Sequence, residues 1–282
     1  MKKFSRFCTY LLPIFLFAAI SQAQTTIITG NDKIQNDKKE TGNSTVKGAK
    51  KNSLENVEVE TGFSTEHLSN NFAPWREFYL SASKKFKSRQ AIYGVYRRTN
   101  RVRQNDDELT AGFYQPVGRR TTFFAEASAS PTHRVLPKFS TLVQIEHSLK
   151  KGWGAQVGWR HTEFNTARTN TGIFTVERYF SKYRAAYTLY ATNLAGVGNS
   201  AAHRVQLTRY YNEKSSLNFS FAAGREVENL GARVIRTDVQ SVGIGGRHWI
   251  NKHWALNYSY NFTRQGSIYT RQGFNVGIRY RF

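Results

Sequence analysis

The sequence predicts an all-β protein, a transmembrane antiparallel up-and-down β-barrel, and three observations support that prediction. Apolar and polar residues alternate along most of the chain, an export signal opens it, and an aromatic strand ends it at Phe282. Such alternation places apolar side chains toward lipid and polar ones toward a lumen. The mean hydropathy of -0.56 agrees, because only every second residue of a barrel strand must be apolar.

The N-terminus predicts export. Three basic residues precede an apolar run over residues 11–20, and small residues follow at Ser21 and Ala23. A membrane anchor is the alternative interpretation, but the run is about half the roughly 20 residues that a spanning helix needs. We therefore expect residues 1–23 to be a cleaved signal peptide and the mature protein to lie in the outer membrane of a Gram-negative cell.

The composition changes twice along the mature chain. Residues 24–53 are rich in Thr, Asn, Lys, Asp and Gly and almost devoid of aromatic residues. A segment of this kind buries too little apolar surface to fold, so it is expected to be a disordered polar periplasmic segment. From residue 54 the period-two alternation continues to the end, which predicts that residues 54–282 form the barrel domain.

The last strand shows the alternation most clearly. Similar patterns cover residues 254–262, 216–221 and 153–160, whereas residues 173–180 break phase and predict a bulge. In the last strand one face carries Phe274, Val276, Ile278, Tyr280 and Phe282, and the other carries Gly273, Asn275, Gly277, Arg279 and Arg281. The terminal Phe282 also matches the signal by which such barrels are recognised for insertion, so the barrel-assembly machinery is an expected partner.

Short and longer connections alternate, which predicts about fourteen strands. An even number of strands places the N- and C-termini together in the periplasm. The first strand, near residues 57–64, is the least clear, so twelve strands is the alternative. Short turns are expected near residues 87–88, 118–119, 150–151, 181–182, 213–214 and 251–252, and longer outer loops near Asn70, Asn105, Arg134, Arg168, Ala195, Gly231 and Ser267.

Several spaced motifs occur along the predicted barrel: Glu60-Thr61-Gly62-Phe63-Ser64, Trp75, Arg134-Val135-Leu136-Pro137, Gly152-Trp153-Gly154, Gly158-Trp159-Arg160 and Arg209-Tyr210-Tyr211. In their order and spacing they resemble those of the YaiO family of outer-membrane β-barrel proteins. The resemblance covers the chain from about residue 54 to its end and implies an outer-membrane barrel, with no settled biochemical activity. Barrels of similar strand pattern also form secretion pores for exopolysaccharides, which is an analogy of fold.

The charge balance predicts an anionic partner. The chain has 41 Lys and Arg against 19 Asp and Glu, a formal charge of +22, and +19 once the three basic residues of the signal peptide are removed. Nucleic acid is the usual partner of so basic a chain, but the export signal and the barrel pattern argue against it.

Basic residues in the expected outer loops suggest lipopolysaccharide as a partner. Arginine binds phosphate through two parallel hydrogen bonds, and the outer leaflet presents lipid phosphates at the height of the loops. The alternative is that these side chains only solvate exposed loops. The candidate lipid-phosphate residues are Arg134, Lys138, Arg233, Arg236, Arg264 and Arg271.

A second group of charges is expected to face the lumen. The group could line an anion-preferring channel or bind an anionic polysaccharide. The alternative, which the pattern favours, is that opposed arginines and acids such as Glu77 and Glu126 brace the wall through ion pairs. The candidate ligand-binding residues are Arg160, Arg247, Arg279 and Arg281.

The motifs of common enzymes are missing from the sequence, so we expect no catalytic residue, metal site or cofactor. His161 and Glu163 share one face of a strand, a pair that arises easily by chance, and the only cysteine, Cys8, precedes the cleavage site. The function expected is that of a porin-like barrel that binds or passes an anionic, glycan-like ligand at the cell envelope. A lipid-modifying barrel enzyme and a structural barrel without transport are the alternatives.

Overall fold

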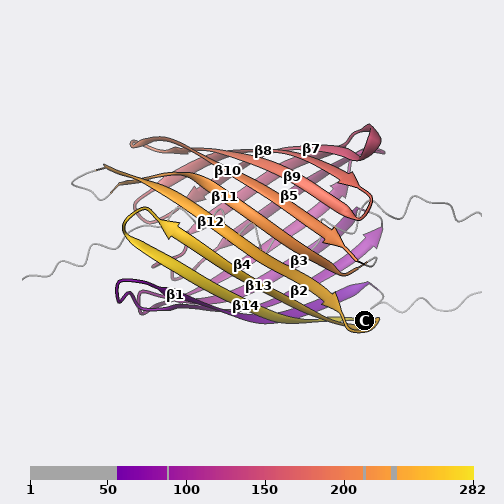
Figure 1. The fold of residues 1–282 in the computed structure, drawn as a ribbon, viewed down its shortest axis with the longest axis horizontal. Helices are drawn as coiled ribbons and strands as arrows, with labels where there is room; N and C mark the ends of the chain where they lie inside the picture. Colours follow the sequence, from indigo (N-terminus) through magenta and orange to yellow (C-terminus); the bar gives the residue numbers. More distant parts are fainter. Residues whose placement is uncertain (1–55, 88, 212–213, 230–233) are drawn as a thin grey trace, which may run out of the picture.

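A computed structural model describes residues 56–87, 89–211, 214–229 and 234–282. The expected signal peptide and the polar segment lie outside these residues. The described part forms fourteen antiparallel strands in one closed barrel (Figure 1). The strands are β1 (Val57–Leu68), β2 (Trp75–Lys87), β3 (Gln90–Arg101), β4 (Gln104–Pro116), β5 (Thr121–Ala129), β6 (Phe139–Ser148), β7 (Trp153–Glu163), β8 (Arg168–Phe180), β9 (Tyr183–Leu194), β10 (Gly198–Tyr210), β11 (Ser216–Asn229), β12 (Val234–Trp249), β13 (Trp254–Gln265) and β14 (Tyr269–Arg281).

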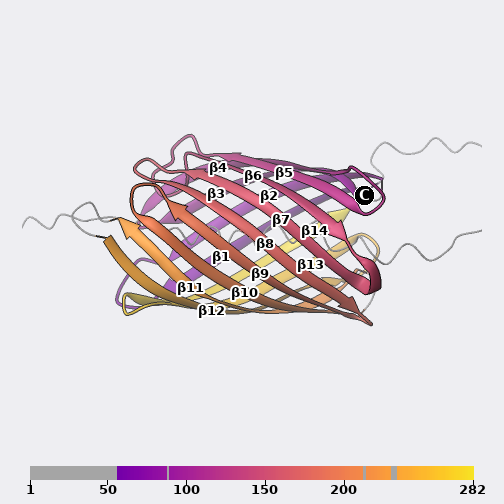
Figure 2. The same cartoon turned by 90° about the horizontal axis from the view of Figure 1, so that it is seen from above.

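Each strand pairs with its neighbour in the sequence, and β14 closes the barrel against β1. The closing register runs from Glu58 opposite Arg281 to Leu68 opposite Arg271. The described beginning and end of the chain therefore lie at one rim, which we call the terminal rim; the other is the far rim (Figure 2). The fold class and the strand number predicted from the sequence are confirmed. That the terminal rim faces the periplasm stays a prediction.

Outward and inward side chains differ in polarity along most of the described wall. In β14, Phe274 is 57% exposed on the outer surface, whereas Arg279 is 1% exposed inside the barrel. The outer surface carries a broad band of large apolar side chains, which suits contact with hydrocarbon, and the interior carries Arg, Glu, Thr and Ser. This is the distribution expected of a transmembrane barrel, in which only the lumen accepts polar groups.

Helical structure is minor in the described residues. A single turn of 3-10 helix, η2 (Lys150–Gly152), precedes β7. No helix in this part of the chain is long and apolar enough to cross a membrane.

The connections differ from the expectation of short turns opposite longer loops. Two residues, Val102 and Arg103, join β3 to β4 at the far rim, and Asn105 lies within β4. Both connecting residues have the left-handed backbone, with φ of 52° and 61°, that two-residue hairpin turns need. The expectation of a long loop was wrong here because this turn lacks the usual Asn-Gly or Asp-Gly signal. The longest described connection is residues 130–138, between β5 and β6.

The bulge expected at residues 173–180 was also wrong. The register of β8 with β7 and with β9 runs without a shift. The pattern had seemed to break because Ile173 is apolar yet faces the lumen, where it is buried, while Phe174 and Val176 face outward. The described register irregularity lies instead in β2, between Lys85 and Lys87.

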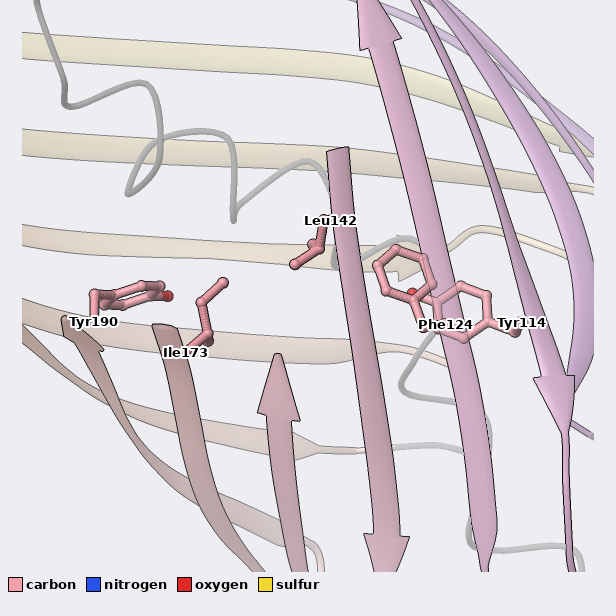
Figure 3. Packing of buried hydrophobic residues seen from close by; sticks show 5 residues of the cluster. All are labelled: Tyr114, Phe124, Leu142, Ile173 and Tyr190. Atoms are coloured by element: carbon pink, nitrogen blue, oxygen red, sulfur yellow. The ribbon is translucent and has the colours of Figure 1, made fainter. Parts of the chain in front are cut away.

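An apolar band crosses part of the inner wall. It consists of Tyr114, Phe124, Leu142, Ile173 and Tyr190, from β4, β5, β6, β8 and β9. Figure 3 shows these five side chains side by side across the wall. The rings of Tyr114 and Phe124 stack with centroids 4.4 Å apart. The interior is thus polar on most strands, and in this part of the wall apolar side chains lie beside the charged side chains of Glu126 and Arg160.

Candidate functional site

Most lumenal arginines are paired with carboxylates. Arg97 lies 2.9 Å from Glu108 and 3.2 Å from Glu77. Arg184 lies 2.6 Å from Glu177, and Arg160 approaches Glu126 at 3.9 Å, with both arginines largely buried. The pairs of Arg97 and Arg184 join neighbouring strands, and the pair of Arg160 with Glu126 reaches from β7 across β6 to β5. They offset the cost of holding charges away from water.

The densest group of charges lies where the barrel closes. Arg279 donates from Nε to Glu60 at 2.7 Å and from Nη1 to Glu58 at 2.6 Å. Arg281 also binds Glu58, and the hydroxyl of Tyr79 donates to Glu60 at 2.7 Å. We call Glu58, Glu60, Tyr79, Arg279 and Arg281 the closure cluster. It links β14, β1 and β2, the strands that must meet to complete the barrel.

A close backbone approach accompanies the closure cluster. The ring of Tyr79 lies over Gly62 of β1, so that a Cβ atom at position 62 would come within 2.5 Å of it. Only glycine leaves this space. The side chain of Tyr79 therefore lies flat against the wall, where its hydroxyl reaches Glu60.

The four candidate ligand-binding arginines all face the lumen. Arg279 and Arg281 belong to the closure cluster, and the guanidinium of Arg281 also lies 4.1 Å from the ring centroid of Trp249. Arg160 is paired with Glu126, and Arg247 donates to Asn257 at 3.0 Å. The structure brings two of the four together and places each against a protein partner. Their ligand-binding role stays a prediction.

The candidate lipid-phosphate residues fall in different places. Arg134 and Lys138 are exposed on the connection between β5 and β6, and Arg264 is exposed on the outer surface of β13 near the far rim. Arg271 differs from the expectation, because it is 8% exposed inside the barrel and lies 3.3 Å from Glu66. Arg233 lies outside the described residues, and only the backbone of Arg236 is described.

Exposed basic side chains are not confined to the far rim. The terminal rim also presents a set of exposed basic residues in or beside its turns, which the expectation of basic outer loops did not include. They are Arg119, Arg120, Lys150, Lys151, Lys182 and Lys252.

Arg204 in β10 is a lumenal arginine that the sequence analysis missed. It is 6% exposed, and its Nη2 atom has no hydrogen-bond partner among the described residues. Two further buried atoms without such a partner lie in the same region, the Oγ1 of Thr208 and the Oδ1 of Asn218. Thr208 and Asn218 are opposite each other in the pairing of β10 with β11. We call Arg204, Thr208 and Asn218 the polar patch.

The polar patch adjoins the ion pair of Arg184 with Glu177 on one side, since Arg184 is opposite Thr208, and small neutral side chains on the other. The inner wall of β11 and β12 carries Ser220, Ala222, Ser241 and Gly243. In the closed order of fourteen strands, β6 at the middle of the apolar band is seven strands from β13. The inner face of β13 carries Asn257, Ser259, Asn261 and Thr263, so small polar side chains lie opposite the partly aromatic apolar band.

The histidine that the sequence analysis singled out lies on the outer surface. His161 contacts Asn170 at 2.9 Å and stacks on Trp159. Among the described residues, no group of three or more His, Cys, Asp or Glu could hold a metal ion.

Comparisons with known proteins agree with the barrel. The family model of the YaiO membrane beta barrel domain matches residues 56–229. No curated protein matches the sequence.

Solved structures share the fold at low sequence identity. A CymD monoaromatic hydrocarbon channel has a TM-score of 0.58 and 8% identity, over 81% of this chain and 89% of its own. A bacterial polysaccharide outer membrane secretin has a TM-score of 0.53 and 9% identity, over 82% of this chain and 100% of its own. Identity this low supports the fold alone.

Proposed function

The chain belongs to the YaiO family of membrane β-barrels, and we propose that this outer-membrane protein is a non-enzymatic channel that binds and passes an anionic, glycan-like ligand. The observation that carries the proposal is the pair of unlike lumenal walls. The apolar band includes Tyr114, Phe124 and Tyr190, and the opposite strands present small polar side chains. Sites for small polar molecules combine apolar and aromatic surface with a few placed polar groups in this way.

The chemistry of a sugar fits both walls. The C–H face of a sugar ring packs against aromatic rings, and its hydroxyl groups exchange hydrogen bonds with Ser, Thr and Asn. An acidic sugar adds a carboxylate or phosphate, for which arginine is the preferred partner. The structural likeness to a bacterial polysaccharide outer membrane secretin supports a saccharide as the ligand class and does not assign one.

Single-channel recording tests the proposal. The refolded mature protein is inserted into planar bilayers, and ion selectivity is read from the reversal potential under a salt gradient. We then add an oligomer of a uronic acid, or a neutral oligosaccharide of equal length. Stable conductance steps that the uronate oligomer blocks at lower concentration support the proposal. Correctly folded protein that shows neither conductance nor binding of either sugar contradicts it and favours a structural barrel.

Two partner proposals concern the surface rather than the lumen. Phe282 is 48% exposed at the terminal rim, which leaves its ring accessible for the barrel-assembly machinery. Arg134, Lys138 and Arg264 are exposed at the far rim, and we propose that they bind lipopolysaccharide phosphates. Replacing these three by Gln should weaken lipopolysaccharide binding by the purified barrel. Unchanged binding contradicts the proposal.

A further inference from the structure

Arg204 stands apart from the other buried arginines of the lumen. Five other arginines of the described residues are largely buried in the lumen, and each pairs with a carboxylate: Arg97, Arg160, Arg184, Arg271 and Arg279. Arg204 has no such pair in the part of the chain that the structure describes. Its Nη2 atom is buried without a hydrogen-bond partner. A buried guanidinium keeps its charge at all working pH values, so a position of this kind is costly unless an anion binds there.

The neighbours of Arg204 supply no such anion. Its cross-strand neighbours are Thr188 in β9 and Ala222 in β11. The hydroxyl of Thr188 is 2.9 Å from that of Thr175, and the side chain of Gln206, the next lumenal residue of β10, accepts from Arg184 at 3.3 Å. These polar groups are neutral and already have partners. Among the described residues, the Nη2 atom of Arg204 thus has no acceptor.

Thr208 and Asn218 extend the same patch along the wall. Thr208 lies four residues from Arg204 on β10, which is roughly 13 Å at about 3.3 Å per residue. Its hydroxyl Oγ1 and the amide Oδ1 of Asn218 are buried without hydrogen-bond partners among the described residues. One inorganic anion cannot reach groups this far apart. A chain that carries both an anionic group and hydroxyl groups can.

We propose that the polar patch is the ligand-recognition site of the lumen. Arg204 binds a carboxylate or phosphate of an acidic oligosaccharide through two parallel hydrogen bonds. Asn218 and Thr208 bind hydroxyl groups of a neighbouring sugar. The inference rests on the proposed function, because it names the side chains that recognise the anionic glycan.

The test compares Arg204→Gln with Arg209→Gln. Arg209 lies on the same strand and is exposed on the outer surface, so the control removes one positive charge from β10 outside the lumen. Titration calorimetry in detergent measures binding of a uronate oligomer, of a neutral oligomer of equal length, and of inorganic phosphate. We expect Arg204→Gln to weaken uronate binding about tenfold or more, with neutral-oligomer binding unchanged. Arg209→Gln should bind all three probes as the wild type does.

Each result bears on a different part of the inference. Equal uronate binding by the wild type and Arg204→Gln overturns the site and leaves the proposed function standing. A wild-type protein that binds neither oligosaccharide overturns both. Wild-type binding of inorganic phosphate as tight as that of the uronate oligomer overturns the assignment to a glycan. A smaller loss of uronate binding, about threefold to tenfold, is expected for Thr208→Val, which removes one hydroxyl.

Discussion

Arg279 and Arg204 are both arginines buried in the same lumen, and their surroundings differ completely. Arg279, 1% exposed, is held by Glu58 and Glu60 at distances of 2.6 and 2.7 Å. Arg204, 6% exposed, has no carboxylate partner among the described residues and has a buried nitrogen without a hydrogen bond. The comparison teaches that burial alone does not assign a role to a lumenal charge. The interaction partners of each arginine indicate its role. An arginine that pairs with carboxylates stabilises the wall, and an arginine without such a partner can bind a ligand.

The two positions should therefore respond to substitution in opposite ways. Removing Arg279 leaves buried carboxylates without a counter-charge, whereas removing Arg204 relieves a buried charge that has no protein partner. Substitution of the first should affect stability, and substitution of the second should affect binding.

The largest expected effect is that of Arg279→Met. Because Glu60 would remain buried without its partner, the free energy of unfolding should fall by about 3–5 kcal/mol. Urea unfolding of the refolded barrel in detergent micelles measures the change. The double variant Glu60→Gln with Arg279→Met, which removes the pair as a unit, should recover a large part of the loss. A double variant that is no more stable than Arg279→Met would contradict the role assigned to the ion pair.

Gly62→Ala should have the next largest effect. The added Cβ would lie within 2.5 Å of the Tyr79 ring, so the ring must move and its hydroxyl bond to Glu60 is strained. We expect a loss of about 1–3 kcal/mol in the same unfolding experiment. Gly94→Ala is the matched control, since a Cβ there meets its nearest neighbour, the carbonyl oxygen of Thr110, at an ordinary 3.8 Å. Equal losses in the two variants would rule out the close approach as the cause.

Arg204→Gln should have the smallest effect on stability. Without a protein partner to lose, the barrel should keep its free energy of unfolding to within about 0.5 kcal/mol or gain slightly. Loss of several kcal/mol would mean that Arg204 supports the wall as Arg279 does. The same preparation serves for the binding measurements, so stability and recognition are compared in one protein.

The fold was well predicted from the sequence because the alternation of apolar and polar residues can be recognised within each strand by itself. Period-two alternation over β13 and β14 shows which face meets lipid, and the strand count follows from counting such segments. The same rule failed at Ile173, since an apolar residue can face the lumen when it joins a band of other apolar side chains there. Loop length was also mispredicted, because hairpin turns formed by residues such as Val102 and Arg103 lack a recognisable turn signal.

The candidate site was only partly predictable. Alternation correctly placed Arg279 and Arg160 in the lumen, and it would also have placed Arg204 there, since Val205 and Leu207 face outward. What the sequence could not supply is the pairing across strands. Whether a carboxylate faces a given arginine depends on the register between adjacent strands and on the residues of the next strand but one. The closed barrel determines this register and these neighbours.

The most direct test of the division between these arginines is current block by a uronate oligomer through single channels of two variants. One is Arg204→Gln, and the other is the double variant of Glu60→Gln with Arg279→Met, which removes the ion pair without leaving a lone charge. We expect the double variant to be blocked at the same concentration as the wild type, whereas Arg204→Gln should require about tenfold more oligomer. Unchanged block in Arg204→Gln, or loss of block in the double variant alone, would contradict it.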